Sequence, residues 1–490
     1  MLAQIPPVFP TPKLQFGPIL PELILVGAGV VTLLYEAFAR ASRSLTHLLL
    51  SLVGVAAAAV ATAQLWNWTG DPQVMGGMVN ADRYAVVARL LLLAIAAMSL
   101  LYGHHYAERY PEGWRGEFYP LLLFATAGMT LITAAADLIV VFLALEILSL
   151  SLYVLTGLSN RATATEAAMK YFLLGAFSSA FFLYGVAMAY GATSTTSIGA
   201  IALALSGRTG AQPLALLAFA LLAVGFAFKV AAVPFHMWTP DVYQGAPTPV
   251  TAYMSAATKV AAFLALIRVL DVAFQPLTWD WTPVIWTLAA LSVVVGSVLA
   301  IAQTDIKRML AYSSIAHAGF ILTGLTAANQ SGIRAAMFYL ISYAATTLGA
   351  FGVVMLVSAR GEEQTSLSAY AGLGRRSPLL AGLMALFLLS LAGIPPTAGF
   401  MAKVGVFSAA IRAGHWSLAL IGLLSSVVAA FFYLRVLVLM YMQEPVGELD
   451  EDRAILPRVA IAVPAALTLA LGIFPGIVLG VLDKASVLRW

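Results

Sequence analysis

The 490-residue sequence contains no cysteine and few charged residues. Without cysteine the chain cannot form disulfides, bind an iron–sulfur cluster through thiolates or use a thiol nucleophile. Only 10% of its residues are charged and 61% are hydrophobic, whereas about a quarter of the residues in a soluble domain are charged. The mean hydropathy is +0.92. This composition indicates lipid as the solvent and predicts an all-α polytopic membrane protein.

Sequence signals of several other protein classes are also missing. The net charge is only +4 and the basic residues are scattered, so nucleic-acid binding has no support. No GxGxxG or P-loop pattern follows a strand, so we expect no nucleotide site. The N-terminus lacks the features of a cleaved secretory signal, so the first hydrophobic stretch is expected to remain as a span. We also expect no metal ligands and no cofactor-binding residues in this chain.

Fourteen hydrophobic stretches are long enough to cross a bilayer, which takes roughly 20 apolar residues. They lie near 19–39, 46–66, 83–102, 118–134, 136–157, 165–190, 212–235, 249–271, 282–302, 308–327, 332–358, 378–411, 415–442 and 456–482. The loops on one side of the membrane carry twelve basic residues, and the loops on the other side carry eight. The twelve are Arg40, Arg43, Arg109, Arg115, Arg161, Lys307, Arg308, Arg360, Arg375, Arg376, Arg453 and Arg458. The eight are Lys13, Arg83, Arg208, Arg268, Arg334, Arg412, Lys484 and Arg489. The positive-inside rule therefore predicts that both termini lie outside.

An internal repeat is visible in the sequence. Residues 167–188 align without a gap with residues 335–356, and Ser178-Ser179 fall in register with Thr346-Thr347. Alanine-rich helices match easily by chance, so the alignment alone is weak. Each copy, however, is followed by a stretch with proline at mid-membrane, which strengthens the prediction of a repeat.

The two proline-containing stretches predict broken helices. They read VAAVPFHMWTP (230–240) and LAGIPPTAGFMAK (391–403). Proline removes a helix donor and frees the carbonyl about four residues earlier, here near Val230 and near Leu391 and Ala392. Paired broken helices in two repeats point to a transport pathway inside the membrane.

Four charged residues lie in apolar surroundings. Glu146 and Lys259 sit near the middle of their spans, Lys229 lies five residues before a proline, and Lys403 follows the second break. An ionised group at the bilayer centre costs roughly 2.5–3.5 kcal/mol even on a lenient scale. One carboxylate cannot neutralise three lysines, but a desolvated lysine can release its proton. The pattern therefore favours a set of proton carriers, with Glu146 modulating Lys229, over static ion pairs.

Three further residues are weaker candidates. His317 lies among hydroxyl side chains in MLAYSSIAHAGFILTGL, and His236 follows the first break. A lone histidine in a helix, such as His317, is more often a packing residue, and His236 could equally be an interfacial structural residue. Haem ligation by the pair has no other support. Lys170, near the start of its span, could equally be a snorkelling or ion-paired residue, as could Arg161, Arg89 and Arg435.

Four stretches of the sequence resemble the antiporter-like membrane subunits of NADH:quinone oxidoreductase, respiratory complex I. These are VPFHMWTPDVYQGAPTPVTAYMSAATKVAAF (233–263), DIKRMLAYSSIAHAGFILTGL (305–325), LALEILSLSLYVL (143–155) and LAGIPPTAGFMAKVGVF (391–407). The phrase VYQGAPTPV and the lysine at Lys403 are similar to the N-type subunit. An M-type relative would carry a glutamate at that position, and an L-type relative would carry a long C-terminal lateral helix.

The resemblance implies a specific architecture and function. It implies helices 1–3 in residues 1–117, two inverted five-helix repeats in 118–271 and 282–442, and a last helix in 456–490. It maps Glu146, Lys229, Lys259 and Lys403 onto the proton pathway, with Lys170 as an additional member. Flavin, iron–sulfur clusters and quinone would belong to partner subunits, with the M-, K-, J-, A-, H- and L-type membrane subunits as neighbours. Aligning Pro234 with Pro395 sets Lys229 against Ser390, so the two half-channels are not strictly symmetric.

Three functions are consistent with the sequence. The first is a proton-translocating subunit of a bacterial inner-membrane NADH:quinone oxidoreductase, a translocase without redox chemistry of its own. The second is a subunit of a multisubunit cation/proton antiporter, which shares the broken helices and the buried lysines. The third is a non-transporting membrane scaffold, in which changing the lysines alters assembly alone. The VYQGAP phrase favours the first.

Overall fold

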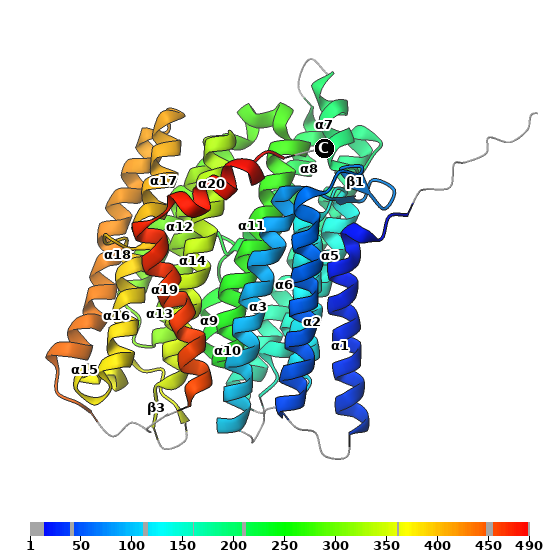
Figure 1. The fold of residues 1–490 in the computed structure, drawn as a ribbon. Helices are drawn as coiled ribbons and strands as arrows, with labels where there is room; N and C mark the ends of the chain where they lie inside the picture. Colours follow the sequence, from blue (N-terminus) through cyan, green and yellow to red (C-terminus); the bar gives the residue numbers. More distant parts are fainter. Residues whose placement is uncertain are drawn as a thin grey trace, which may run out of the picture.

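A computed structural model of the chain describes residues 14–39, 44–110, 116–159, 161–207, 212–359, 362–446 and 454–488 (Figure 1). The first helices are α1 (Leu20–Phe38), α2 (Ser44–Gln64), α3 (Arg83–Arg109), α4 (Phe118–Ala134), α5 (Leu138–Thr156), α6 (Ala162–Thr193) and α7 (Ile198–Ser206). The middle helices are α8 (Pro213–Val230), α9 (Trp238–Gly245), α10 (Thr248–Tyr253), α11 (Lys259–Arg268), α12 (Thr278–Ile301), α13 (Ile306–Leu325) and α14 (Gln330–Leu356). The last are α15 (Leu373–Arg376), α16 (Pro378–Ala392), α17 (Ala398–Arg412), α18 (Trp416–Met442), α19 (Ile455–Ile473) and α20 (Gly476–Ala485).

Short elements complete the described chain. Of two π-helical segments, η3 (Met254–Thr258) joins α10 to α11, and η4 (Val269–Ala273) continues α11 at its end. The 3-10 turns are η1 (Gly17–Ile19), η2 (Leu65–Asn67), η5 (Gln275–Leu277) and η6 (Leu367–Tyr370). Two antiparallel strand pairs lie in loops: β1 (Gln73–Val74) with β2 (Val79–Asn80), and β3 (Ser358–Ala359) with β4 (Glu362–Glu363).

The predicted all-α membrane architecture is confirmed. Every predicted hydrophobic stretch falls on a helix or on successive helices. In the described part of the chain, ten helical segments are long and apolar enough to span a membrane, and α4 and α16 are shorter apolar helices. The number of fourteen spans stays a prediction. At the centre of the bundle, 94% of the most apolar window of α14 is buried, against 33% for α6 and for α18.

Both predicted helix breaks are present. Ala231 at the end of α8 and Gly393 at the end of α16 adopt left-handed backbone conformations, which end the helices. A cis peptide bond precedes Pro234 after the first break, and another precedes Pro396 after the second. The chain then resumes as α9 and as α17. The breaks occur where the sequence places prolines that cannot donate to a helix.

Corresponding contacts occur in the two halves of the chain. Ser178 of α6 donates a 3.4 Å hydrogen bond to the Gly225 carbonyl of α8. Thr346 of α14 and Ser390 of α16 are joined by a 3.2 Å hydrogen bond between their hydroxyls. Helices α6 and α14 carry the two aligned segments. Each of them contacts the first part of the broken helix that follows it, α8 or α16. The contacts support the repeat, but its boundaries at 118–271 and 282–442, and the flanking regions 1–117 and 456–490, stay predictions.

Most of the described basic residues that were assigned to loops lie within or at the ends of helices, and two of them are buried. Arg268 ends α11 and is buried against Asp82, and Lys307 is buried in the first turn of α13. Their placement in loops was wrong, because the groups that contact them are far away in the sequence. Eight of the other basic residues lie outside the described residues: Lys13, Arg40, Arg43, Arg115, Arg208, Arg360, Arg453 and Arg489. The start of α1 and helix α20 lie at one end of the molecule, and β3 and α15 lie at the other (Figure 1).

Candidate functional site

Three lysines lie inside the helix bundle. Lys229, Lys259 and Lys403 expose 2%, 1% and 5% of their surface. Among the described residues, none of the three amines contacts a carboxylate. Each donates instead to hydroxyls or backbone carbonyls. Because charged groups in a low-dielectric interior need compensation, the local surroundings of each lysine decide how easily it keeps its proton.

Lys229 lies at the end of α8 and faces α5 and α6. Its Nζ donates a 2.7 Å hydrogen bond to the hydroxyl of Ser149. The amine also lies 5.6 Å from the ring centre of Tyr153 and 5.4 Å from that of Tyr171. Aromatic faces attract a cation, so they offset part of its desolvation. The surroundings therefore tolerate both the charged and the neutral amine.

Glu146 lies on α5, close to Lys229 but not bonded to it. Its carboxylate accepts a hydrogen bond from Ser179 of α6, and it is near enough to Lys229 for a Coulombic interaction. It is only partly buried within this chain, and its neighbours Leu143 and Ile147 are exposed. This chain alone therefore does not enclose Glu146 completely. Glu146 sits where α5 and α6 face lipid or another protein.

Lys259 joins the end of the first broken helix to α13. Its Nζ donates to the Val230 carbonyl at 2.9 Å and to the Ser314 carbonyl at 2.7 Å. Val230 is the last residue of α8, and its carbonyl is one that the following Pro234 cannot satisfy. The lysine therefore caps a helix end where the carbonyl dipoles favour a positive charge.

Lys403 repeats this arrangement at the second break. Its Nζ donates to the carbonyls of Leu391 and Ala392, the last two residues of α16, at 3.1 and 2.8 Å. It also donates to the Ser426 hydroxyl of α18 at 2.6 Å. Both predicted sets of free carbonyls thus bind a buried lysine. Such helix ends at membrane depth are common cation and proton sites in transporters.

His317 lies on α13 between the two lysines. It is buried and within Coulombic range of both Lys259 and Lys403. Its Nδ1 is 2.8 Å from the Tyr339 hydroxyl, and its Nε2 is 3.3 Å from the Tyr433 hydroxyl. An imidazole with a hydroxyl at each nitrogen can accept a proton on one side and release one on the other.

Two buried hydroxyls near these lysines, those of Tyr171 and Thr258, have no hydrogen-bond partner among the described residues. Buried polar groups of this kind are normally satisfied by ordered water. Tyr171 faces Lys229, and Thr258 directly precedes Lys259, so their location indicates hydration next to both lysines.

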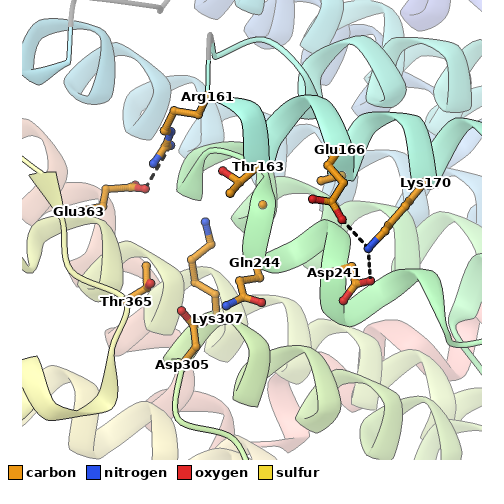
Figure 2. Close-up of a pocket in the computed structure, with 12 residues that line it drawn as sticks. Arg161, Thr163, Glu166, Lys170, Asp241, Gln244, Asp305, Lys307, Glu363 and Thr365 are labelled. Carbon is orange, nitrogen blue, oxygen red and sulfur yellow. Dashed lines mark hydrogen bonds and ion pairs between the residues drawn. The ribbon is translucent and has the colours of Figure 1, made fainter.

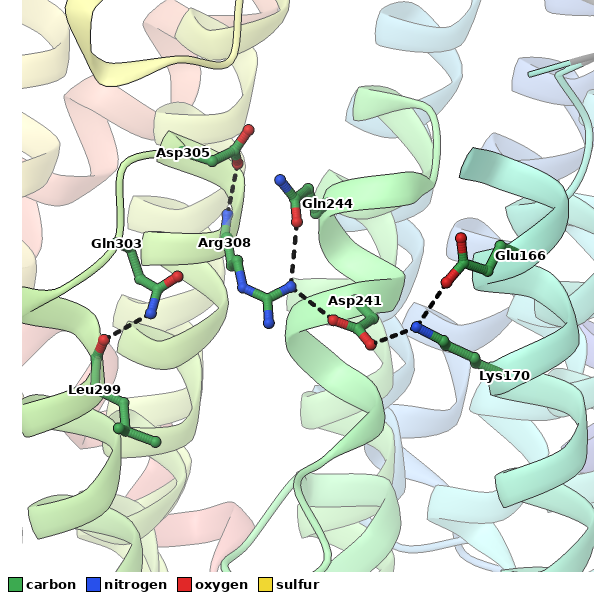
Figure 3. Close-up of polar contacts among 8 residues, drawn as sticks. All are labelled: Glu166, Lys170, Asp241, Gln244, Leu299, Gln303, Asp305 and Arg308. Carbon is green, nitrogen blue, oxygen red and sulfur yellow. Dashed lines mark hydrogen bonds and ion pairs between the residues drawn. The ribbon is translucent and has the colours of Figure 1, made fainter. Parts of the chain in front are cut away.

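Lys170 and His236 lie apart from this line. Lys170 forms 2.8 Å ion pairs with Glu166 and Asp241 at one end of the molecule, and Arg308 pairs with the other oxygen of Asp241 at 2.6 Å (Figure 3). Partial burial acts to raise the pKa of Asp241, but the hydrogen bonds from Lys170 and Arg308 outweigh it and hold the pKa below its ordinary value. His236 is partly exposed between α8 and α9 and makes no hydrogen bond to the lysines within the described residues.

Sequence reasoning missed four partners of the charged groups. Ser149, Ser426, Tyr339 and Tyr433 contact Lys229, Lys403 and His317. Ser149 could have been found, because it follows Glu146 by three residues and shares its helix face. The other three come from helices whose neighbours the sequence does not reveal.

Comparison with known proteins decides the family. The family model described as "NADH:quinone oxidoreductase/Mrp antiporter, TM" matches residues 135–429, a range that includes Glu146 and the three lysines. The chain is also 47% identical to NADH-quinone oxidoreductase subunit N of Rhodococcus opacus (strain B4), over 98% of this chain and 97% of that relative. The chain belongs to the NADH:quinone oxidoreductase/Mrp antiporter membrane-subunit family.

Solved structures carry the same antiporter-like fold. A chain in respiratory complex I from Thermus thermophilus with bound aureothin is 37% identical, with a TM-score of 0.80, over 94% of this chain and 98% of that chain. A chain of the Mrp complex from Dietzia sp. DQ12-45-1b matches with a TM-score of 0.83 at 21% identity, over 96% and 97% of the two chains. The second likeness shows the fold alone.

Proposed function

We propose that the chain is an N-type, proton-translocating membrane-arm subunit of a bacterial NADH:quinone oxidoreductase. The observation that carries the proposal is the placement of Lys259 and Lys403 on the free carbonyls of the two broken helices. The family membership and the 47% identity to a subunit N support it. The 21% identity to the Mrp chain supports the shared fold but does not favour the cation/proton antiporter alternative.

In this proposal protons move laterally along five groups. Glu146 influences the charge of Lys229. Lys229 directly precedes Val230, and the Val230 carbonyl binds Lys259. From Lys259 the proton passes by way of His317 to Lys403. At an effective dielectric near 20, charges about 4 Å apart interact by about 4 kcal/mol, so small displacements can drive transfer. Moving a proton across 100 mV takes about 2.3 kcal/mol, which a redox step in partner subunits supplies.

We further propose where the remaining parts of the reaction lie. Flavin, iron–sulfur clusters and quinone belong to partner subunits, as the likeness to NADH-quinone oxidoreductase subunit N implies. The chain also has no cysteine that could ligate an iron–sulfur cluster. The M-, K-, J-, A-, H- and L-type membrane subunits are the partners, and the bilayer covers the remaining apolar surface. The chain lies in the inner membrane with both termini on the outer side, and Lys170 and His236 are secondary members of the pathway.

The test replaces Lys259 with methionine, which keeps the length of the side chain but cannot carry a proton. The intact complex is reconstituted into liposomes, and protons pumped per NADH oxidised are measured. We expect fewer protons per NADH, with the complex still assembled. Lys484→Met, which changes an exposed lysine of α20, is the matched control.

Two outcomes would reject the proposal. Full pumping by an assembled Lys259→Met complex would remove the lysine from the pathway. The scaffold alternative would be favoured if every change at Lys229, Lys259 and Lys403 prevented assembly of the complex. These changes include lysine-to-arginine substitutions, which keep the charge.

A further inference from the structure

A polar pocket lies between the two halves of the chain. Its volume is about 360 Å³, and α6, α9, the start of α13 and the β4 segment line it (Figure 2). Three basic and four acidic side chains line it. The basic residues are Arg161, Lys170 and Lys307, and the acidic residues are Glu166, Asp241, Asp305 and Glu363. Because charges of both signs are interleaved, the pocket suits water better than a concentrated anion or cation.

Two buried ionisable groups in this pocket are incompletely paired. Lys307 is 1% exposed, and its Nζ donates to the Ala246 carbonyl at 2.6 Å, which uses one of its three protons. The Glu363 side chain is 4% exposed and lies 3.5 Å from Arg161 through one oxygen. Its other oxygen, Oε1, has no partner among the described residues. Figure 2 shows the Lys307 amine pointing toward Arg161 and Glu363.

The gap between these two groups needs a polar occupant. A buried carboxylate oxygen and a buried ammonium that do not touch each other both lack hydrogen bonds, which is costly unless water supplies them. The pocket has room for several waters, each of which takes about 30 Å³ in the liquid. Water bridging Lys307 and Glu363 would connect them to the open side of the pocket.

Polar groups continue from the pocket toward Lys259. The Ala246 carbonyl that binds Lys307 also accepts a 3.4 Å hydrogen bond from the Thr251 hydroxyl. Thr251 donates to the Tyr243 carbonyl at 3.0 Å, and the Tyr243 side chain lies beside that of Ser314. The Ser314 carbonyl accepts from Lys259.

One buried hydroxyl along this route adds to its polarity. Thr248 Oγ1, on α10, has no hydrogen-bond partner within the described residues. Water that satisfies it would extend the polar connection between the pocket and the buried lysine.

We propose that this pocket is the water-filled chamber through which protons reach Lys259, with Lys307 and Glu363 as the groups that admit them. The proposal rests on the proposed proton-translocating function. A hydronium ion that enters the pocket from the solvent gives its proton to the Glu363 carboxylate and becomes water. Glu363 passes the proton to Lys307 as Lys307 passes one inward to neutral Lys259. Glu363 and Lys307 return to their starting states and Lys259 gains the proton, so charge balances and no oxidant or reductant is needed. Lys307 and Glu363 thereby act as positioning and relay residues rather than as struts.

The test blocks the pocket in a protein that has already folded. Because the chain has no cysteine, Thr365→Cys places a single thiol of this chain on the pocket wall. The intact complex is treated with a sulfonate-bearing methanethiosulfonate reagent, and protons pumped per NADH are measured before and after removal of the label by dithiothreitol. We expect a loss of pumping that the reductant reverses. Ser368→Cys, exposed three residues further on, and the treated wild-type complex are the controls.

A second measurement addresses the two relay groups themselves. Glu363→Gln is expected to lower protons pumped per NADH, whereas Glu444→Gln, which breaks an exposed ion pair with Arg375 outside this pocket, is expected to leave them unchanged. Complete labelling of Thr365→Cys with unchanged pumping, or full pumping by Glu363→Gln, would overturn the proposal. If Lys259→Met stops pumping while these two changes do not, this intake route is wrong and the proposed function stands.

Discussion

Arg268 and Asp82 form a buried ion pair with two hydrogen bonds, 2.8 and 3.0 Å long. The carboxylate also accepts from the Ala85 amide and so caps α3. Asp82→Asn keeps a capping side chain but leaves the buried guanidinium without its counter-charge. Breaking one partner of such a pair costs about 3–5 kcal/mol. We expect a clearly lower thermal midpoint for release of this subunit from the purified complex.

The matched control for Asp82→Asn is a change in an exposed ion pair, that of Arg334 with Asp483. The side chains of these two residues are 39% and 53% exposed. Surface pairs contribute about 0–1 kcal/mol, so Asp483→Asn is expected to change the midpoint little. Equal effects of Asp82→Asn and Asp483→Asn would show that burial of the first pair does not determine its contribution.

Single residues were predictable where the signal is local. Lys229, Lys259 and Lys403 stand out because each interrupts a long apolar run, and the structure buries all three. The partner of Arg268 lies 186 residues away, and no pattern in the sequence connects them. Lys307 follows a polar turn, so it resembled a loop residue although its helix buries it.

Helices α12 and α13 approach closely at two glycines. A Cβ added at Gly296 would lie 2.5 Å from the Ala316 amide nitrogen, and one added at Gly319 would lie 2.7 Å from that of Val293. Gly296→Val would therefore force the two backbones apart, and overpacking of this kind typically costs about 1–3 kcal/mol. We expect less assembled complex in membranes, measured on native gels.

Gly480→Val in α20 is the matched control, because a Cβ at Gly480 would meet nothing within 4 Å. Both changes place a β-branched residue in a helix, so they share the cost in helix propensity. Normal assembly of the Gly296→Val complex would show that the two helices can separate without cost.

The broken helices show how far elements can be predicted. Proline lacks the donor that a helix needs, so the breaks near residues 234 and 395 follow from sequence alone. Which group would satisfy the freed carbonyls does not follow, because Lys259 lies 29 residues after Val230 and reaches it only through the folded bundle. The lining of the pocket was likewise not predictable, since the loop after α14 supplies Glu363 from far along the chain.

Asp241 connects three helices through its pairs with Lys170 of α6 and Arg308 of α13. Its pKa is held below the ordinary value of 3.8, so its contribution to stability is complete above about pH 4. That contribution is lost as the pH falls through the lower, folded-state pKa. We expect Asp241→Asn to lower the thermal midpoint of the subunit at neutral pH and to match the wild type in strong acid.

The control for the pH dependence is Asp71→Asn, which changes an exposed aspartate in the loop before β1. Its effect on the midpoint is expected to be small at every pH. A difference between wild type and Asp241→Asn that persists unchanged in strong acid would show that the amide disturbs packing rather than charge.

At the scale of the whole molecule, several arginines belong to elements at one end. Arg375 and Arg376 lie in α15, and Arg161 pairs with Glu363 of β4, the partner strand of β3. α15 and β3 lie at one end of the molecule, whereas α20 and the start of α1 lie at the other (Figure 1). Cytoplasmic ends of membrane proteins carry the excess of lysine and arginine. The pocket with Lys307 and Glu363 opens among these basic residues, so the orientation also sets the side from which protons enter.

Single cysteines in this cysteine-free chain can test that orientation. Ser368→Cys lies exposed near β4, and Met78→Cys lies exposed between β1 and β2 at the opposite end. We expect a membrane-impermeant maleimide to label Met78→Cys in right-side-out vesicles and Ser368→Cys only in inside-out vesicles. The reverse pattern would place both termini inside. The proposed chamber would then open on the outer side. Protons leaving the cytoplasm would have to enter the chain elsewhere, so the chamber could not be their intake.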